Sequence, residues 1–406
     1  MQMQFSCEAT IVPARIRIGE WLCAWKRSRV CGGRVEHAHK KGRGAAPALW
    51  SKPTGDTATS MKVGDWVEVK TPAEIRCTLD TQGTLDGMPF MPEMLEFCGR
   101  RFQIRKSAHK TCESMTHKAR YLKDVVHLDT RCSGTAHGGC MAGCLLFWKK
   151  AWLRSVDGPA SQEIPAEDCA KTEATPKPSE MVARMLSNYC VIANNGVVRY
   201  SCQATQIREA SNPLRWWDMR QYVRDLRSGN LTMGELACGT THAFWMAMIR
   251  LLPRSRLVRS CYEHLRFLWR GSAFPRRMGT IPCGERTPVS NLNLRAGELV
   301  RVRSISEIDH TLDCAGKNRG LYFDPEQIPY TNRTFRVLRH VERIINEDTG
   351  EMLPMKTPAV VLESVVCRGQ YGRCRMFCPR SAYLLWREAW LERAESCTPQ
   401  FKEEER

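Results

Sequence analysis

The sequence lacks any apolar run long enough to cross a bilayer. Its longest runs, such as Ala243 to Ile249, are broken by an arginine well short of the roughly 20 residues that a spanning helix needs. Residues 1–60 also lack a compact hydrophobic stretch followed by a small-residue cleavage site, which argues against a secretory signal. We therefore expect a cytoplasmic protein without a transmembrane segment, in a reducing environment that disfavours disulfides.

Recognisable catalytic motifs are missing as well. No Ser/His/Asp pattern, phosphate-binding glycine loop or H-E-x-x-H motif occurs. The C-x-x-C pairs of zinc knuckles and the C-x-x-x-C-x-x-C spacing of radical enzymes that use S-adenosylmethionine are absent too. The sequence thus leaves open whether the protein is an enzyme and which substrate it would take.

What the chain does contain is typical of a globular protein. With 406 residues, 43% hydrophobic and 26% charged, it is long enough for two or three domains. Its formal net charge of +18 attracts phosphates, nucleic acid or an anionic surface. In a reducing compartment, clusters among its 20 cysteines are better explained by metal than by disulfides.

The same module occurs twice. Gly64 matches Gly297, a displacement of 233 positions (297 − 64), and the same displacement relates further residues without a gap as far as Phe102 and Phe335. Chance does not produce such a series, so we infer an internal repeat. The matched pairs include Val67 and Val300, Val69 and Val302, Asp80 and Asp313, Gly87 and Gly320, Phe90 and Phe323, and Glu93 and Glu326.

Composition shifts set the expected boundaries. Residues 1–60 are basic and aperiodic, so they are either a disordered basic arm or a mis-assigned start ahead of Met61. Stretches rich in proline and glycine indicate linkers. The expected order is the first cysteine module at 61–154, a linker at 155–182, a middle domain at 183–278, a linker at 279–295, the second cysteine module at 296–393, and a tail at 394–406.

The sequence pattern predicts that each module forms a small barrel. Apolar and polar residues alternate at 66–69, 102–104 and 125–128, and glycine and proline turns separate these strands. We expect an α+β protein in which two SH3-like β-barrels, each with a C-terminal helix, flank a mainly helical middle region. In that region, Asn194-Asn195-Gly196 predicts a hairpin between Cys190 and Cys202, and helices are expected at 212–229, 232–252 and 254–269.

Each module ends in a cysteine trio: Cys132, Cys140 and Cys144 in the first, and Cys367, Cys374 and Cys378 in the second. Cysteines four positions apart lie on one face of a helix, and we expect such a helix after Gly138-Gly139. A helix N-terminus would also favour the thiolate, the form that binds metal. Both trios are therefore predicted to bind a metal, either zinc or an iron–sulfur cluster.

The fourth ligand is left open by the sequence. Candidates in the first copy are Cys112 and His137, followed by Cys98 and His109, but none has a ligand at the matching position of the second copy. Either the two sites differ, or the middle hairpin donates Cys190 or Cys202, or three thiolates leave one position open. The matching residues are Ile345, Tyr371, Thr331 and Glu342.

Two further patterns favour structural roles. One pattern is a pair of carboxylates that both copies contain, Asp80 with Glu93 and Asp313 with Glu326. Such a pair could act in general acid–base catalysis, but these residues lie beside turns, which favours turn and cap roles. The other pattern is a series of arginines interleaved with aromatic residues at 250–270, which could bind nucleic acid or a membrane surface. The simpler interpretation is a solvated basic face with the aromatic side chains packed inward. The residues are Arg250, Arg254, Arg256, Arg259, Arg266 and Arg270, with Tyr262, Phe267 and Trp269.

Three segments resemble an uncharacterised bacterial family with a duplicated cysteine-rich module. They are LDGMPFMPEM at 85–94, HLDTRCSGTAHGGC at 127–140, and FCPR at 377–380 with WREAWL at 386–391. The resemblance covers roughly 61–393 and leaves out the first 60 residues. It implies a setting beside polysaccharide and natural-product biosynthesis genes.

Two functions are compatible with these patterns. The first is a cytoplasmic thiolate-metal protein that assists or catalyses a step in a bacterial biosynthetic pathway, with a partner protein or a small-molecule substrate. The second is a nucleic-acid-binding protein whose SH3-like modules are stabilised by zinc. Only the second function requires an affinity for nucleic acid that falls steeply as the salt concentration rises.

Limited proteolysis tests the boundaries. We expect the first cuts within Ser155 to Glu180, because a linker rich in proline and acidic residues exposes its backbone to a protease. Mass spectrometry of the fragments locates the cuts. Early cleavage between Gly64 and Leu153 would contradict the proposed first module.

Overall fold

A computed structural model describes residues 61–114, 116, 118–159, 190–192, 196–252, 255–266, 279–371 and 376–394. Expectations about residues 1–60, most of the first linker and Cys374 lie outside these residues. All the described residues belong to one compact unit. Sheets and a few helices alternate along it, so the chain is a mixed α/β protein.

The first copy begins with a strand and a capped turn of helix. Thr71 accepts the Glu74 amide and Glu74 reaches back to Thr71, a reciprocal cap that starts helix α2 at Pro72. Strand β1 then pairs on one side with β4 and on the other with β9. The elements are β1 (Trp66–Val69), α2 (Pro72–Arg76), β2 (Thr84–Leu85), β3 (Met88–Pro89), the 3₁₀ turn η1 (Pro92–Phe97), β4 (Arg101–Ser107), β5 (Lys110–Cys112), β6 (Ala119–Tyr121), β7 (Val125–Leu128), β8 (Trp148–Lys149), η2 (Lys150–Trp152) and β9 (Leu153–Ser155).

The second copy repeats this order at the displacement found in the sequence. From β13 to the start of β16, every element begins 233 positions after its counterpart, and the last two begin 238 positions after theirs (391 − 153). Sheet order repeats as well, β8-β7-β4-β1-β9 in one copy and β17-β16-β13-β18 in the other, with Trp386 bridging to Val360. The elements are β13 (Leu299–Val302), α7 (Ile305–Asp309), β14 (Lys317–Asn318), β15 (Leu321–Tyr322), η4 (Pro325–Tyr330), β16 (Thr334–Ile345), β17 (Met352–Leu362), η5 (Glu388–Trp390) and β18 (Leu391–Arg393).

The two cores are built alike, around an aromatic trio. Phe90 meets Trp152 edge-on with ring centroids 5.3 Å apart, and Phe323 meets Trp390 in the same way at 5.2 Å. Such edge-to-face pairs are favourable beyond the apolar area they bury. All four of Trp148, Trp152, Trp386 and Trp390 are fully buried.

One polar contact inside this core also recurs. The Trp152 indole donates to the Thr78 hydroxyl at 3.0 Å, and Trp390 donates to Thr311 at the same distance. Each hydroxyl in turn donates to the end of the preceding helix, at Ile75 O or Ile308 O. The buried indole N–H is thereby satisfied in both copies.

The prediction that each module ends in a C-terminal helix is wrong. Its place is taken by three-residue 3₁₀ turns: η2 joins β8 to β9, and η5 leads into β18. Residues 138–147 form a loop rather than a helix. Gly138, Gly139 and Gly143 there adopt positive φ, a conformation that a right-handed helix excludes.

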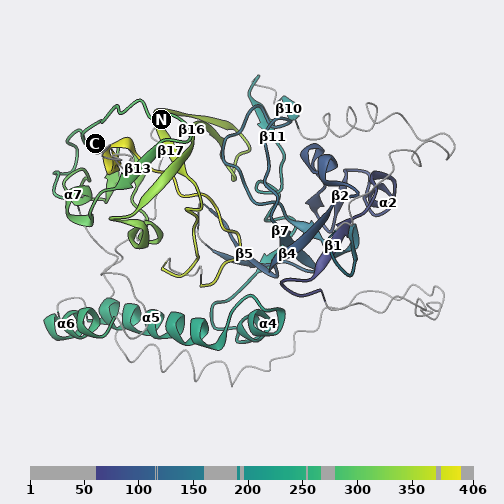
Figure 1. The fold of residues 1–406 in the computed structure, drawn as a ribbon, viewed down its shortest axis with the longest axis horizontal. Helices are drawn as coiled ribbons and strands as arrows, with labels where there is room; N and C mark the ends of the chain where they lie inside the picture. The colour runs from purple at the N-terminus through teal and green to yellow at the C-terminus, as the bar shows by residue number, and fades with distance from the viewer. Residues whose placement is uncertain are drawn as a thin grey trace, which may run out of the picture. The chain divides into compact units, whose positions relative to one another are not determined.

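The middle segment contains the predicted hairpin and three helices. Strands β10 (Cys190–Ile192) and β11 (Val198–Tyr200) pair antiparallel, which confirms the hairpin. Helices α4 (Arg220–Ser228), α5 (Met233–Leu251) and α6 (Arg256–Leu265) follow one another along the chain (Figure 1). Thr232 and Ser255 cap α5 and α6, while Gly229 ends α4 with a φ of 79°.

The start predicted for α4, with Asn212 as the cap and Pro213 as the first helical residue, is wrong by seven residues, because α4 begins at Arg220. Asn212 and Pro213 form strand β12, which pairs with Tyr121 and Arg120 of β6 instead of opening a helix. Strand β11 contacts the second copy, because the Tyr200 amide donates to Gly350 O at 2.8 Å. The middle segment is thus hydrogen-bonded to both copies.

Within the described residues, no helix combines the length and the apolar character needed to cross a membrane.

Thr78 provides a test of the duplicated core. Replacing it by Val keeps the shape but leaves the buried Trp152 N–H without an acceptor, so we expect a loss of about 1–3 kcal/mol in the free energy of unfolding. Urea denaturation followed by tryptophan fluorescence measures it. Thr78→Ser keeps the hydroxyl and serves as the control; equal stability of Thr78→Val and Thr78→Ser would contradict the role of this contact.

Candidate metal centre

The first cysteine trio lies on a loop that folds back on itself. The Cys132 amide donates to Cys144 O at 2.9 Å, which joins the two ends of the loop. Gly134 permits the tight turn between them, since a Cβ there would lie 2.0 Å from Cys140 O. The trio is therefore brought together by a glycine-rich loop, and not by the helical spacing that the sequence indicated.

Four cysteines from separate parts of the chain line one cavity. They are Cys132, Cys140 and Cys144 of this loop and Cys202, which follows β11. The cavity has a volume of about 30 Å³, enough for an ion or one or two waters. Its other walls are mostly apolar, formed by residues such as Leu146, Phe147 and Ile345.

Burial makes the thiols of Cys132, Cys144 and Cys202 hard to ionise. It raises the pKa of Cys144 to about 11 and that of Cys202 to about 12, with a further contribution from the neighbouring cysteines. The pKa of Cys132 is also raised, first by burial and then by repulsion from Glu93, Cys144 and Cys202. Several thiolates together are costly here without a cation, and a bound metal supplies that charge.

A buried carboxylate holds the same loop. Glu93, the second residue of η1, accepts the Ala136 amide at 3.1 Å and Nδ1 of His137 at 2.7 Å, and Cys132 Sγ lies 3.8 Å from the same oxygen. Burial raises the pKa of Glu93, but the hydrogen bond and charge of His137 outweigh it, so the pKa is lowered. Sequence reasoning gave Glu93 a cap role and missed its contact with His137.

Glu93, Cys132 and His137 are themselves a possible ligand set, with ligand atoms all within 4.8 Å of one another. His137, however, has both ring nitrogens engaged, Nδ1 with Glu93 and Nε2 with Ser201 O at 3.2 Å. An imidazole binds metal through a free lone pair, so His137 would have to give up one of these bonds. We infer that His137 supports the loop and that Cys202 is the better fourth ligand.

The second trio is placed only in part. Cys367 is half-buried and Cys378 buried, while Cys374 lies outside the described residues. Cys112, a candidate for the first site, instead acts on Cys378, whose pKa is raised by Cys112 and by burial. For Cys190 the structure gives only its strand position, opposite Tyr200.

The remaining candidates lie elsewhere. Cys98 is a half-buried thiol at the end of η1, and burial raises its pKa to about 11. His109 is buried against Asp225, its Nε2 lying 3.3 Å from the carboxylate. Asp80 accepts amides of its own turn, as Asp313 does in the second copy, so both act as turn residues.

One arginine connects the two cysteine regions. Arg380, two residues after Cys378, donates to Cys112 O at 2.8 Å and pairs with Glu347. Its charge also favours the thiolate of Cys144 and so opposes the rise that burial causes in the pKa of that thiol. Although buried, its guanidinium has a raised pKa because Glu347 and the neighbouring thiols favour its charge.

In the described part of the arginine-rich segment, the side chains agree with a solvated basic face and an aromatic residue packed inward. Tyr262 is fully buried between helices α5 and α6, whereas Arg250, Arg256 and Arg259 are exposed. Phe267, Trp269, Arg254 and Arg270 lie outside the described residues.

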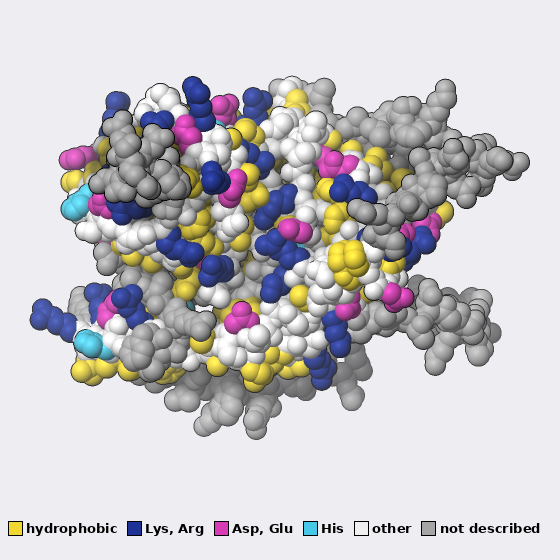
Figure 2. All heavy atoms as spheres, viewed as in Figure 1, with side chains coloured by type: hydrophobic (Ala, Val, Ile, Leu, Met, Phe, Trp, Pro, Cys, Tyr) yellow, Lys and Arg dark blue, Asp and Glu magenta, His cyan; other side chains and the backbone are white. Residues whose placement is uncertain are grey.

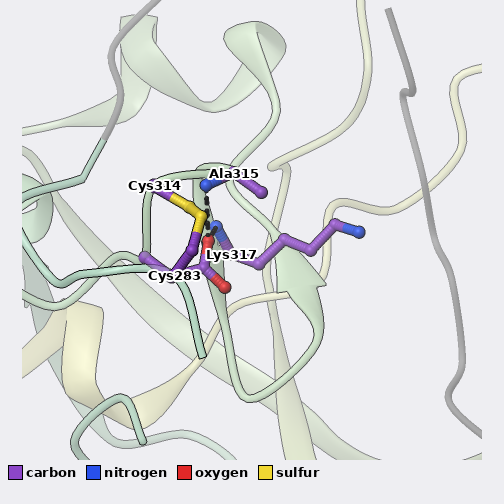
Figure 3. The surroundings of a disulfide bond; sticks show 5 residues. Cys283, Cys314, Ala315 and Lys317 are labelled. Carbon is purple, nitrogen blue, oxygen red and sulfur yellow. Dashed lines mark hydrogen bonds between the residues drawn. A yellow bond between two sulfur atoms is a disulfide. The ribbon is translucent and has the colours of Figure 1, made fainter. Parts of the chain in front are cut away.

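One cysteine pair departs from the expectation of reduced thiols. Cys283 and Cys314 form a disulfide with Cα atoms 5.4 Å apart. Figure 3 shows Cys314 on the turn where the amides of Ala315 and Lys317 donate to Asp313. The bond ties the second linker to the start of the second copy.

Comparison of the chain with family models, curated proteins and solved structures finds no match.

Replacing Glu93 tests how much its buried charge stabilises the fold. Glu93→Gln keeps the shape but removes the charge that faces His137, so we expect a loss of about 2 kcal/mol in the free energy of unfolding. Because folding lowers the pKa of Glu93 below 4.5, its stabilisation is complete above that pH and disappears as the pH falls through the folded-state pKa. The difference between variant and wild type should therefore shrink in acid.

Urea denaturation at a series of pH values measures this difference. Glu96, exposed on the same 3₁₀ turn, provides the control as Glu96→Gln. A Glu93→Gln difference that is constant from neutral pH to pH 3 would contradict the assignment.

Proposed function

We propose that this protein binds a metal through cysteine thiolates, with Cys132, Cys140, Cys144 and Cys202 as the ligands of one centre. The observation that carries the proposal is the convergence of four cysteines from two distant segments on one cavity. Three of them come from the glycine-rich loop and the fourth from the segment that follows β11, so neighbouring positions in the sequence do not explain their meeting. Four thiolates are a complete ligand set for zinc or for an iron–sulfur cluster.

Two features favour different metals. The small volume of the cavity suits a single ion such as zinc. The four thiols do not form a set within 4.8 Å of one another, in contrast to Glu93, Cys132 and His137, and this wider spacing suits a cluster. Zinc would make the centre structural, holding together loops with few regular hydrogen bonds, whereas a cluster would add redox chemistry.

We further propose that each copy is a small SH3-like barrel. In support, the first five-stranded sheet has β8 and β9 at its two edges, and the 3₁₀ turn η2 joins these edges directly. The last strand thus returns to pair with the first, which is how a short sheet closes on itself. The mainly helical character of the middle region is part of the same proposal.

The setting proposed for this metal protein is a step in a bacterial biosynthetic pathway in the cytoplasm. It rests on the resemblance of the 127–140 and 377–391 segments to a family found beside such genes. A partner protein or a small molecule would be the object of that step.

Nucleic-acid binding is the second candidate, and the net charge of +18 favours it. Figure 2 shows Lys and Arg side chains interspersed with acidic and hydrophobic ones on the face drawn. A nucleic-acid groove usually gathers its basic residues into a patch or stripe. The face drawn therefore gives nucleic-acid binding no support beyond the net charge.

Metal analysis tests the main proposal. We expect protein purified without oxygen to contain stoichiometric zinc or iron, and Cys202→Ser to lose the metal of the first centre. Elemental mass spectrometry gives the amount, and visible charge-transfer absorption appears only with iron. Cys77→Ser, at an exposed thiol, is the matched control.

Wild-type protein without stoichiometric metal would disprove the proposal. Affinity for single-stranded nucleic acid that falls steeply with salt in such metal-free protein would support the second candidate instead.

A further inference from the structure

One oxygen of the buried Glu93 carboxylate has no hydrogen-bond partner. Among the described residues, no donor reaches Oε2, whereas Oε1 accepts the Ala136 amide and faces Nδ1 of His137. Only 3% of the Glu93 side chain is exposed, so bulk water does not solvate the free oxygen. A buried carboxylate oxygen without a donor is costly, and it marks a place where a cation or a water belongs.

The matching carboxylate of the second copy is satisfied at both oxygens. Glu326 Oε2 accepts the Arg368 amide at 3.2 Å, and Oε1 accepts the Tyr371 amide at 2.6 Å. At Glu93 the contacts of the loop converge on Oε1 instead. Both carboxylates therefore hold a cysteine loop, but of the two only Glu93 keeps an oxygen for another ligand.

We propose that Oε2 of Glu93 binds the metal ion of the first centre, which makes this centre a carboxylate–thiolate site for a single divalent ion such as zinc. The inference rests on the proposed function, because it adds a ligand to the same centre. It also decides between the two metals, since zinc accepts mixed oxygen and sulfur ligands, whereas iron–sulfur clusters are held mainly by thiolates. His137 then orients the carboxylate and is not itself a ligand.

The distance between Glu93 and Cys132 fits one ion. Cys132 Sγ lies 3.8 Å from Oε1, and Glu93, Cys132 and His137 offer ligand atoms that all lie within 4.8 Å of one another. Around tetrahedral zinc, a sulfur at about 2.3 Å and an oxygen at about 2.0 Å lie about 3.5 Å apart. Cys132 and His137 also line the cavity that the other three cysteines share. An ion bound to Glu93 and Cys132 thus adjoins the thiols that complete its coordination.

His137 holds the carboxylate in this position. Its Nδ1 lies 2.7 Å from Glu93 Oε1, and its Nε2 lies 3.2 Å from the carbonyl oxygen of Ser201, the residue before Cys202. The imidazole thereby connects the carboxylate to the segment that supplies the fourth cysteine. Carboxylates that bind metal are commonly hydrogen-bonded in this way, and such partners strengthen the binding of the metal.

X-ray absorption at the zinc edge tests the assignment on the full chain, loaded with zinc and kept reduced without oxygen. We expect one oxygen neighbour at about 2.0 Å beside sulfur neighbours at about 2.3 Å. Glu93→Gln keeps the shape but replaces the ligand charge by an amide, so the oxygen neighbour should disappear. Affinity for Zn²⁺, measured by competition with a chromophoric chelator, should fall by more than about 10-fold, because even an outer partner of a ligand is worth about 10–100-fold.

Two matched variants separate a lost ligand from a disturbed loop. Glu326→Gln removes the carboxylate that holds the corresponding loop of the second copy, and it should leave the oxygen neighbour and the Zn²⁺ affinity unchanged. His137→Gln keeps a side-chain N–H for Oε1 and should keep the oxygen neighbour. A cooperative unfolding transition in urea shows that each variant is folded, and the wild-type spectrum needs no substitution at all.

Three outcomes would overturn the inference and leave the proposed function standing. The first is stoichiometric zinc with sulfur neighbours only. The second is an oxygen or nitrogen neighbour that persists in Glu93→Gln, which would assign it to a buried water or to His137. The third is an iron–sulfur cluster in wild-type protein purified without oxygen. Wild-type protein without metal would instead disprove the proposed function itself.

Discussion

One buried carboxylate holds each cysteine loop in place. Glu93 and Glu326 occupy the second position of η1 and η4, and each accepts amides of the loop that follows its first cysteine. A buried carboxylate charge is costly without such donors, and at Glu93 they all reach Oε1. The 3₁₀ turn and the cysteine loop must therefore stay together, although they are about 40 residues apart in each copy.

Much of the surrounding fold was predictable because its signals are local. The displacement of 233 positions recurs from strand to strand, and the helix expected from 232 agrees with α5, which Thr232 caps. The helix expected at Cys140 and Cys144 failed for a physical reason, since spacing alone does not show that Gly138, Gly139 and Gly143 adopt positive φ. Asn212-Pro213 reads as a helix start, but pairing with β6 overrides that preference.

Comparing the two copies left the fourth ligand open and gave Cys202 only as one alternative among several. Such comparison finds ligands at matching positions, whereas the structure brings Cys202 to the first trio and Cys112 to Cys378, and neither has a matching cysteine. Packing between the modules decides which distant segments meet. The repeated sequence pattern does not predict these contacts. His137 attracted attention as a metal-binding residue type, yet both its nitrogens are already engaged.

These contacts make the two copies dependent on each other. Arg131 of the first cysteine loop stacks on Tyr383 at 3.9 Å and donates to Ser381 O, and the Met141 amide donates to Arg343 O. Arg380 of the second copy donates to Cys112 O at 2.8 Å, and its charge opposes the rise that burial causes in the pKa of Cys144. Because charges interact strongly at short range in a buried place, residues of both copies determine the surroundings of this guanidinium. Each copy therefore completes contacts of the other.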